Sequence, residues 1–596
     1  MSGIYISNII NEKDELNKKF NSLNNVEFKS INFQGLTICS FTSSYSKFLN
    51  NTELEKDIFI YDSLCISYQG KIYNLDEIVQ QLLQLGIQIK TKNESEVILL
   101  GYKTWGERLF SKLNGLFILS IFDSLNKKII CARDRFGIKP CYYSWKNGIV
   151  EICSRLQPLI NKESKISEEA IAYFFNYGYI PTPISIVSDI RKLKPAHYLI
   201  IDLSTNIVNE YPYWDLYPVE TNNISYNDAK SELHELIKDA VKIRIEPDKA
   251  IGTFLSGGVD SSIVTSILAK QANTQISSYT IAFDNPKFDE RNIAKQYSEL
   301  IGTKHHEFIF SPENALELID KLVEVYDEPF ADSSALPTLF LSSKSHEFTS
   351  IAFTGDGGDE NFLAQGQFAS IKKFEKLKMI PFFARKLLSN FVNDQRIKNI
   401  LTTLNNDQFM NISLYGTEGY LLNNTSLLNI DKYYLKYKNL SNSSVQNLAD
   451  FSIKFLWENG YNVKVERANS SYSINLRSPL LDYRIVEFAR KLPIGYRLDG
   501  NSGKKILKDI LEDYIPRNVF EQPKKGFSMP LGLWIRSILK DEVMTNIELH
   551  HEKRFSFFNS QKFELLLKNH MSGIEDNSLY IWRVYILNKW LDKYKL

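Results

Sequence analysis

The sequence predicts a multi-domain α/β protein, because its two parts differ in how hydrophobic residues are spaced. A chain of 596 residues is too long for a single hydrophobic core. Up to about residue 205 the sequence consists mainly of short β-type runs, whereas from about residue 226 short apolar runs alternate with long helical patterns. We therefore expect an amino-terminal domain (residues 1–205), a linker (206–225) and a carboxyl-terminal domain (226–596).

The amino-terminal domain is expected to be rich in strands, with few long amphipathic stretches between them. Its β-type runs are residues 36–41, 64–68, 117–122, 128–132 and 198–202. An aromatic and proline-containing segment, residues 211–218, and the polar residues 221–225 are typical of a linker.

Strands and helices alternate at the start of the carboxyl-terminal domain. Helices are expected at residues 229–244, 261–271 and 291–300, and the strands that follow them at 250–255, 277–283 and 306–310. Such alternation predicts a doubly wound parallel sheet with its ligand at the carboxyl ends of the strands. The remainder of the chain has mainly helical periodicity.

Charge and cysteine content limit the partners and the cellular compartment. Lys and Arg total 71 and Asp and Glu total 70, a net charge of +1, which predicts neither a nucleic acid nor a membrane surface as partner. Apolar runs such as residues 115–122 have the length of strands, and no signal peptide is recognisable at the amino terminus. Five cysteines without a CxxC motif predict a reduced, cytoplasmic protein without structural zinc.

A phosphate-binding loop is the strongest functional motif. It reads Ser256-Gly257-Gly258-Val259-Asp260-Ser261-Ser262, between a predicted strand and a predicted helix. Glycines let the backbone approach a phosphate, serines add hydroxyl donors, and the helix N-terminus directs free amides at the anion. Asp260 is suited to hold Mg²⁺ between phosphate oxygens. The motif is not a Walker A loop and is similar to the pyrophosphate loop of enzymes that attack the α-phosphate of ATP; the alternative is an ordinary Gly-rich turn.

A second, acidic loop follows another apolar run, residues 350–353. It reads Thr354-Gly355-Asp356-Gly357-Gly358-Asp359-Glu360. Because strand ends meet at one edge of a parallel sheet, we expect it beside the first loop, with Asp359 as the second Mg²⁺ ligand. The alternatives are an acidic surface turn and a Ca²⁺ loop, although the rest of a twelve-residue Ca²⁺-binding pattern is missing.

These loops belong to six motifs whose order resembles that of asparagine synthetases over nearly the whole chain. The other four are residues 327–338, 464–467, 476–482 and 524–527. Residues 70–74, 96–99 and 132–140 resemble the glutaminase-like domain of that family. The resemblance implies an amino-terminal αββα domain of the Ntn glutaminase type and a carboxyl-terminal ATP pyrophosphatase (PP-loop) synthetase domain with added helices.

The resemblance also implies roles for individual residues. Backbone groups would contact the nucleotide at Leu255, Ile281, Thr354 and Gly355. Asp356 would support the acyl-adenylate step, and Lys464 and Lys524 would hold phosphate and stabilise the adenylation transition state. Lys504 is a weaker candidate, because Lys504, Lys505 and Lys508 are also compatible with the solvated face of a helix.

The amino terminus departs from the glutamine-dependent pattern of the family. Such enzymes begin Met-Cys-Gly-Ile, whereas this chain has Ser2 in place of the cysteine, and a hydroxyl is a much weaker nucleophile than a thiolate. Gln69 replaces the oxyanion-donating Asn, Lys71 replaces a Glu, and Glu94 replaces the Asp that binds the glutamine amine. The arginine-containing stretches that clamp glutamine are not found. These departures predict an inactive glutaminase domain kept as a scaffold.

Two further departures lie where the acceptor substrate is expected. Residues 474–477 read Ile-Asn-Leu-Arg instead of Leu-Glu-Val-Arg, and residues 361–365 read Asn-Phe-Leu-Ala-Gln instead of Leu-Phe-Gly-Gly-Tyr. An altered substrate is therefore considered alongside aspartate.

Three functions are compatible with the sequence. The first is an ATP- and Mg²⁺-dependent ligase that activates a small-molecule or peptide carboxylate for attack by ammonia or an amine. The second is a cyclase of the β-lactam synthetase or lasso-peptide type, and the third is an inactive regulatory paralogue. The presence of Asp260, Asp359, Lys464 and Lys524 weighs against the third. A homodimer is left open.

Overall fold

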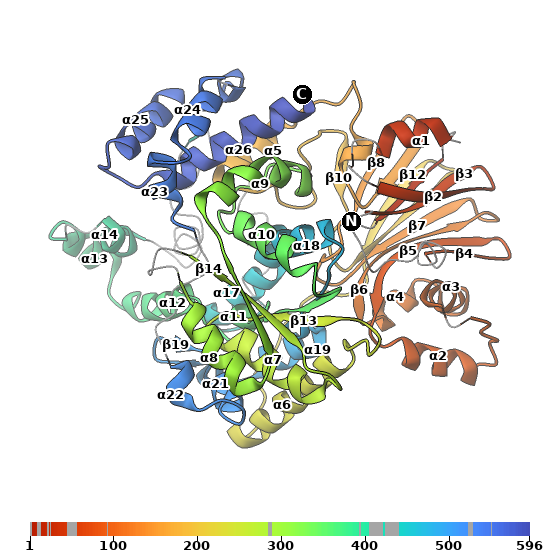
Figure 1. Cartoon of the computed structure of the whole chain (residues 1–596), viewed down its shortest axis with the longest axis horizontal. Coiled ribbons are helices and arrows are strands. Elements are labelled where there is room, and N and C mark those ends of the chain that lie inside the picture. Colours follow the sequence, from red (N-terminus) through yellow and green to blue (C-terminus); the bar gives the residue numbers. More distant parts are fainter. Residues whose placement is uncertain are drawn as a thin grey trace.

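The architecture is that of a computed structural model of the full chain. It describes residues 3–596 except for 9–12, 21–22, 24–25, 44–56, 92, 284–288, 393–394, 404–420, 424–439, 522–528 and 550. Two six-stranded sheets occupy the amino-terminal part and a five-stranded sheet the carboxyl-terminal part, with helices around all three (Figure 1).

The two amino-terminal sheets are antiparallel and pack face to face. The first has the order β10 (Ile190–Lys192), β8 (Tyr142–Lys146), β9 (Ile149–Cys153), β1 (Gly3–Ser7), β3 (Leu36–Ser43) and β2 (Val26–Phe33). The second has the order β12 (Ile207–Pro212), β11 (His197–Asp202), β7 (Lys128–Arg133), β6 (Gly115–Asp123), β5 (Leu64–Ile72) and β4 (Ile58–Tyr61). Apolar side chains from both sheets, such as Ile6, Ile38 and Ile118, form one buried cluster between them.

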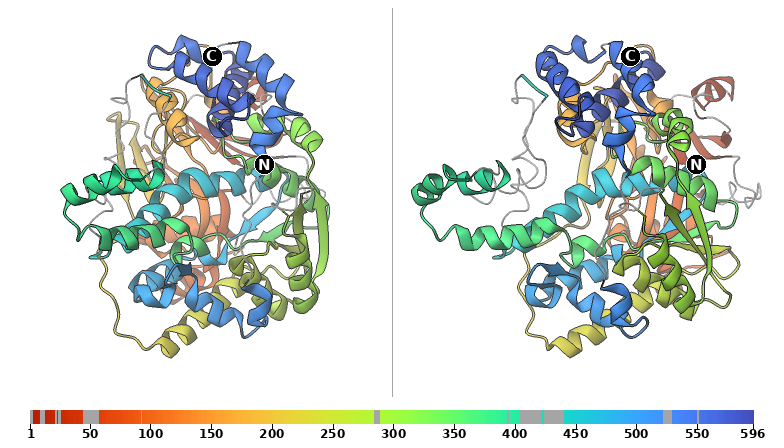
Figure 2. Two further views of the ribbon diagram at one scale, coloured as in Figure 1. Left: turned by 90° about the vertical axis from the view of Figure 1, so that its left-hand side faces the viewer. Right: turned by 60° about the vertical axis from the view of Figure 1, so that its left-hand side comes forward.

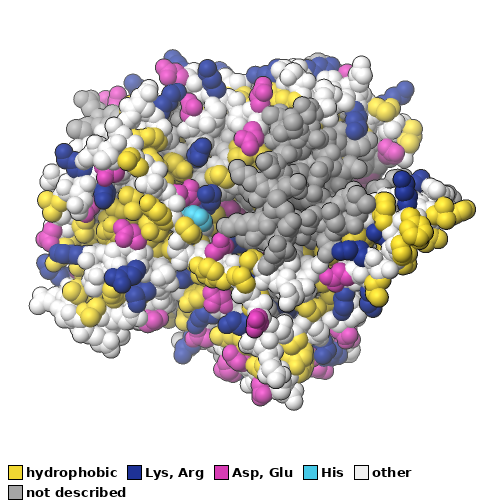
Figure 3. Space-filling model, turned by 180° about the vertical axis from the view of Figure 1, so that it is seen from behind, with side chains coloured by type: hydrophobic (Ala, Val, Ile, Leu, Met, Phe, Trp, Pro, Cys, Tyr) yellow, Lys and Arg dark blue, Asp and Glu magenta, His cyan; other side chains and the backbone are white. Residues whose placement is uncertain are grey.

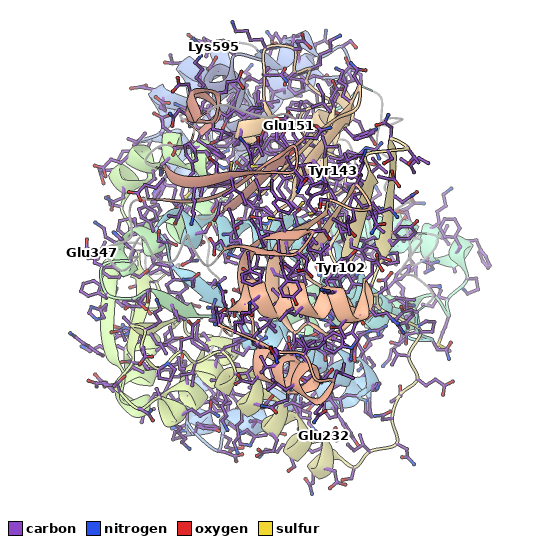
Figure 4. The ribbon with its side chains drawn as sticks, turned by 90° about the vertical axis from the view of Figure 1, so that its right-hand side faces the viewer. Tyr102, Tyr143, Glu151, Glu232, Glu347 and Lys595 are labelled. Atoms are coloured by element: carbon purple, nitrogen blue, oxygen red, sulfur yellow. The ribbon has the colours of Figure 1, made fainter. Side chains whose placement is uncertain are left out.

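Helices cover the outer faces of both sheets, which gives the expected αββα layers. Helices α2 (Leu75–Gln84) and α3 (Glu94–Trp105) pack on the second sheet, while α1 (Lys13–Phe20) and α5 (Glu168–Tyr177) pack on the first. Figure 4 shows this half from the side, with Tyr102 of α3 next to one sheet and Tyr143 and Glu151 in strands of the other. Sequence periodicity did not predict α2 and α3. In α3 seven of the twelve residues are buried, from Ser95 to Gly101, so this helix lacks the polar face that an amphipathic pattern would show.

The carboxyl-terminal sheet is parallel throughout, as predicted. Its order is β15 (Lys304–Ile309), β14 (Ser277–Ala282), β13 (Ile251–Phe254), β16 (Ile351–Phe353) and β17 (Asn475–Arg477). One face is covered by α6 (Tyr226–Lys242), α7 (Val259–Gln271) and α8 (Arg291–Ile301), and the other by α9 (Pro312–Val325), α10 (Ala335–Ser345) and α18 (Asn462–Ser471) (Figure 1). The doubly wound arrangement is confirmed, and each predicted strand and helix of this region is present within a few residues of its expected bounds.

Further helices extend this domain. Helices α23 (Leu531–Arg536), α24 (Lys540–Glu548), α25 (Ser560–Met571) and α26 (Ser578–Tyr594) pack together beside α5 and α9. Helices α12 (Gly366–Leu377), α13 (Phe382–Ser389) and α14 (Gln395–Thr402) form a lobe that projects from the body (Figure 2). No helix among the described residues is long and apolar enough to span a membrane.

Buried ion pairs join the two parts of the chain. Arg133 Nη1 lies 2.9 Å from Glu458 Oε1, Arg155 Nε lies 2.7 Å from Asp327 Oδ1, and Lys192 Nζ lies 2.7 Å from Glu328 Oε2. Lys139 also contacts Glu466. Because removing one member of a buried pair leaves a charge without compensation, these contacts fix the relative placement of the two parts. The whole of β12 lies inside the expected linker, and the division into domains at residues 205 and 226 stays a prediction.

Candidate active site

Two loops meet at the carboxyl ends of neighbouring strands, as the sequence predicted. Strand β13 pairs directly with β16, with Thr253 opposite Phe353, so the loops that follow them leave the sheet side by side. The first loop ends at the N-cap of α7, Gly258, and the second leads into the short helix α11 (Gly358–Asn361). The region between these strand ends is where a doubly wound fold binds its ligand.

Hydroxyl groups hold the first loop in shape. The Oγ atoms of Ser256 and Ser261 lie 3.0 Å apart, and Ser262 Oγ donates to the carbonyl of Gly258 over 2.8 Å. Helix α7 therefore begins directly after a hydrogen-bonded loop, and Asp260 lies in the first turn of the helix. A helix N-terminus of this kind favours a phosphate group.

Glycines allow the two loops to approach each other. A Cβ atom on Gly358 would lie 2.2 Å from Asp260 Oδ1, and one on Gly355 would lie 2.5 Å from the carbonyl carbon of Asp260. Gly357 has a φ of +97°, which a residue with a side chain rarely adopts. The glycines of the second loop are thus needed to bring its carboxylates beside Asp260.

Lys504 lies between the two predicted metal ligands. Its ammonium contacts the carboxylates of both Asp260 and Asp359, and the residue is only 5% exposed. Lys504 is the N-cap of α21 (Lys505–Leu511), with a φ of +61°, and its backbone N–H donates to the carbonyl of Phe362 over 2.7 Å. Burial alone would lower the pKa of Lys504, but the two carboxylates outweigh it and hold the pKa above its usual value.

The solvated-face interpretation of Lys504 is therefore wrong. Helical periodicity grouped this residue with Lys505 and Lys508, which are half-buried and outside the cluster. The left-handed backbone at position 504 turns its side chain inward, and no periodic pattern encodes that conformation.

The pair Asp260 and Asp359 fits a divalent cation. Mg²⁺ in nucleotide sites is usually bound by one or two carboxylates and completed by phosphate oxygens and water. Both carboxylates reach one cationic group, which is the arrangement that a shared cation requires. Among the described residues no group of three or more His, Cys, Asp or Glu is placed to hold a metal ion.

Two more acids belong to the second loop, of which Glu360 is buried and Asp356 is half-buried. Burial raises the pKa of Asp356, and Thr354 Oγ1 partly offsets this by donating to Asp356 Oδ2 over 2.6 Å. Burial and the nearby charge of Asp359 raise the pKa of Glu360 to about 7. Perturbed acids in a cleft are typical of functional sites. The sequence analysis gave Glu360 no role, although its place beside Asp359 after a strand was a usable signal.

Lys464 comes to the same site from α18. Its Nζ lies 3.1 Å from Asp332 Oδ2 and 2.8 Å from Ser334 Oγ. Although burial opposes it, the charge of Lys464 holds the pKa of Asp332 below its usual value, and it also partly offsets the rise that burial causes in the pKa of Asp356. Lys464 therefore faces the second loop.

The remaining predicted residues fall into two groups. Leu255 is buried at the end of β13, where its N–H donates to the Tyr279 carbonyl over 3.0 Å, and Ile281 is buried in the adjacent strand β14. Lys524 and Ser2 lie outside the described residues.

The region expected to bind glutamine contains a closed ion pair. Lys71 Nζ lies 3.1 Å from Glu94 Oε1, and Tyr68 donates its hydroxyl to the other oxygen of Glu94 over 3.1 Å. Gln69, which replaces the oxyanion donor, lies on β5 opposite Ile118 and is buried. The carboxylate that would bind a substrate amine is thus engaged by a residue of the protein itself.

Comparisons with known proteins match a family model to each of the two parts of the chain. The asparagine synthase family model matches residues 232–592, and the glutamine amidotransferase domain model matches residues 59–214. Asparagine synthetase [glutamine-hydrolyzing] 1 of Bacillus subtilis is 26% identical over 541 residues, covering 88% of this chain and 85% of the relative. The cattle asparagine synthetase is 25% identical, covering 82% of this chain and 76% of the relative. This chain belongs to the asparagine synthase family.

Proposed function

We propose that the protein is an ATP-dependent, amide-forming ligase that activates a carboxylate as an acyl-adenylate and transfers the acyl group to ammonia or an amine. The observation that carries this proposal is the cluster in which buried Lys504 contacts the half-buried carboxylates of Asp260 and Asp359 at two adjoining strand ends. One lysine faces two carboxylates there, directly beside a helix N-terminus, which suits a phosphate group with its cation.

The first half of the reaction joins two anions. A carboxylate oxygen attacks the α-phosphorus of ATP, and the bond to the bridging oxygen breaks to release pyrophosphate. Mg²⁺ held by Asp260 and Asp359 would neutralise phosphate charge. The amides at the start of α7 and the ammonium groups of Lys464 and Lys504 would stabilise the charge that moves onto pyrophosphate. Lys524 is assigned the same role from its motif.

The second half forms the amide. The nitrogen attacks the acyl carbon, AMP leaves with the bonding electron pair, and the nitrogen loses a proton. Glu360 is suited to accept that proton, because burial and Asp359 raise its pKa to about 7, near physiological pH. Asp356, whose pKa is raised by burial, would support the adenylate side of the site.

We further propose that nitrogen does not come from glutamine in this chain. Ser2 replaces the thiol nucleophile, and the Lys71 to Glu94 ion pair occupies the carboxylate that would bind the glutamine amine. Several contributions to the transition state for hydrolysis are weakened together.

A cyclase is the second candidate, favoured by the surroundings of Glu360. Gln365 Nε2 donates to Glu360 Oε1 over 2.6 Å and lies 3.3 Å from the hydroxyl of Tyr461. Gln365 stands where the family has a different sequence, so the acceptor side of the cleft is altered. An amine carried on the substrate itself would suit this change, as in β-lactam synthetases and lasso-peptide cyclases.

ATP–pyrophosphate exchange tests the proposal. Purified full-length protein with Mg²⁺ should exchange labelled pyrophosphate into ATP only when the correct carboxylate is present, with aspartate first in a screen of small-molecule and peptide acids. The Asp359→Ala variant should lose the signal. Exchange by no carboxylate, or equal exchange by Asp359→Ala, would contradict the proposed activity.

A further inference from the structure

The projecting lobe carries a concentrated apolar surface. Six large apolar side chains within thirteen residues are exposed: Met379, Ile380, Phe383, Leu387, Leu388 and Phe391. Met379, Phe383 and Phe391 are 85%, 76% and 82% exposed. Figure 3 shows hydrophobic side chains gathered on this lobe at the edge of the molecule, with basic side chains beside them. We call residues 379–391 the apolar stripe.

The local geometry fixes the stripe on the outer side of α13. Phe383 and Leu387 lie four residues apart on one face of the helix, and Phe391 follows two residues beyond the end of the helix. The opposite face carries Arg385 and Ser389, which are buried. Arg385 Nη1 donates to the carbonyl of Thr403 over 2.8 Å, just beyond the end of α14, and its Nε donates to the carbonyl of Ile380. This contact anchors the inner face of α13 against the neighbouring segment and keeps the apolar side chains in solvent.

Positive charge surrounds the stripe. Lys373, Lys376 and Lys378 near the end of α12 and Lys386 on α13 are exposed. Between residues 366 and 392 the only acidic residue is Glu375, which accepts a hydrogen bond from the backbone of Ser444 over 3.3 Å. The whole chain has a net charge of only +1, so this excess is local.

We propose that the lobe is a docking surface for an anionic lipid membrane, with the apolar stripe inserted among the head groups and the lysines paired with lipid phosphates. Bulky apolar side chains flanked by lysine are what a helix lying in the membrane interface requires. A second copy of the chain fits less well, because two such lobes would bring lysines face to face. The lobe protrudes (Figure 2), whereas a partner helix would need a groove.

This proposal departs from the sequence-based expectation of no membrane-surface partner. That expectation followed from charge averaged over 596 residues, and the structure gathers part of the positive charge on one projection. The catalytic cleft plays no part in the inference, so the two proposals stand or fall separately.

Vesicle sedimentation tests the proposal with the full-length protein. Wild type should sediment with vesicles of phosphatidylglycerol and phosphatidylcholine at low salt and stay in solution with phosphatidylcholine alone. Phe383→Ser/Phe391→Ser and Lys373→Glu/Lys376→Glu should each weaken binding about tenfold or more, and salt should release the wild type. Matched controls are Leu125→Ser, at a side chain 80% exposed on another hairpin, and Lys162→Glu/Lys165→Glu.

Three outcomes would overturn the proposal. The first is that the wild type does not bind anionic vesicles, and the second is that the Phe383→Ser/Phe391→Ser variant binds them as strongly as the wild type. The third is that sedimentation velocity shows concentration-dependent dimers of the wild type which this variant no longer forms. The last would assign the stripe to a second copy of the chain. The thermal unfolding temperature should be unchanged in all four variants, which shows that they remain folded.

Discussion

In each of the two parts of the molecule a lysine contacts acidic side chains, but the number of acidic partners differs: one in the amino-terminal part and two in the carboxyl-terminal part. In the amino-terminal part Lys71 faces Glu94, and their charges cancel. In the carboxyl-terminal part Lys504 faces both Asp260 and Asp359, so the three side chains, of which the lysine is buried and the carboxylates are half-buried, carry one formal negative charge. A pair whose charges cancel leaves no charge for a further ion, whereas a cluster with excess negative charge is suited to bind a further cation. The comparison assigns the chemistry to the carboxyl-terminal part.

Removing either predicted metal ligand should have the largest effect on rate. Asp260→Ala and Asp359→Ala each delete one preorganised charge beside the phosphates, so substrate-dependent pyrophosphate release should fall on the order of 10²–10³-fold. Asp541→Ala, at an exposed position of α24, is the control. Release at near wild-type rates by Asp359→Ala would remove the basis for the metal site. The same assay on Lys524→Ala tests the role assigned to that lysine from its motif.

Lys504→Met should lower the stability of the protein and make it more dependent on Mg²⁺. Loss of the ammonium leaves two carboxylates facing each other, and breaking a buried pair in this way costs about 3–5 kcal/mol. The thermal unfolding temperature should therefore drop, and Mg²⁺ should restore more of it than it adds to the wild type. Lys508→Met, a change to the neighbouring lysine at the surface, should not respond to Mg²⁺ in this way. An equal Mg²⁺ response in both variants would argue against the shared cation.

Glu360 should impose a pH dependence on amide formation. Because burial and Asp359 raise its pKa to about 7, the fraction of ionised Glu360 increases as pH rises through that value. Amide formation should increase through the same range, whereas Glu360→Gln should be slow and lack the step. The rate of amide formation against pH, with pyrophosphate exchange recorded in parallel, provides the measurement. A step near pH 7 that persists in Glu360→Gln would mean that another group titrates.

The same residue predicts a change of stability with pH. Its pKa is about 7 in the folded protein against 4.5 as a reference, so the native state binds the extra proton between these values. Stability therefore falls as pH rises from 4.5 to about 7. Glu360→Gln should flatten that slope in urea unfolding. An unchanged slope would contradict the raised pKa.

Ser2→Ala should have the smallest effect. The proposed function leaves Ser2 no glutaminase site to complete, because Glu94 is engaged by Lys71 and Gln69 replaces the oxyanion donor. Pyrophosphate release with ammonium should be the same for Ser2→Ala and the wild type. A large loss would show that the amino-terminal residue contributes to the reaction.

Sequence patterns predicted both loops, most of the parallel sheet and part of the amino-terminal sheets, because these features depend on neighbouring residues. Short apolar runs and helical spacing identified four of the five strands of the parallel sheet and the helices between them, and turn glycines marked the loops at their ends. The close approach of Gly358 to Asp260 follows from the direct pairing of β13 with β16.

Features that depend on distant residues were not predictable in this way. Lys504 meets Asp260 across 244 positions, and it does so through a left-handed backbone that its local pattern does not reveal. The raised pKa of Glu360 depends on burial, which the three-dimensional packing alone decides. Arg133 and Glu458, 325 positions apart, likewise become partners only when the two parts of the chain pack together.

Measuring glutamate release and pyrophosphate release in the same reaction tests the central claim most directly. The wild type would be supplied with ATP, Mg²⁺, the carboxylate found by exchange, and either ammonium or glutamine. The account predicts pyrophosphate release and amide product with ammonium, and no glutamate above background with glutamine. Glutamate release that keeps pace with pyrophosphate release, and that Ser2→Ala abolishes, would contradict it and return the chemistry to both parts of the molecule.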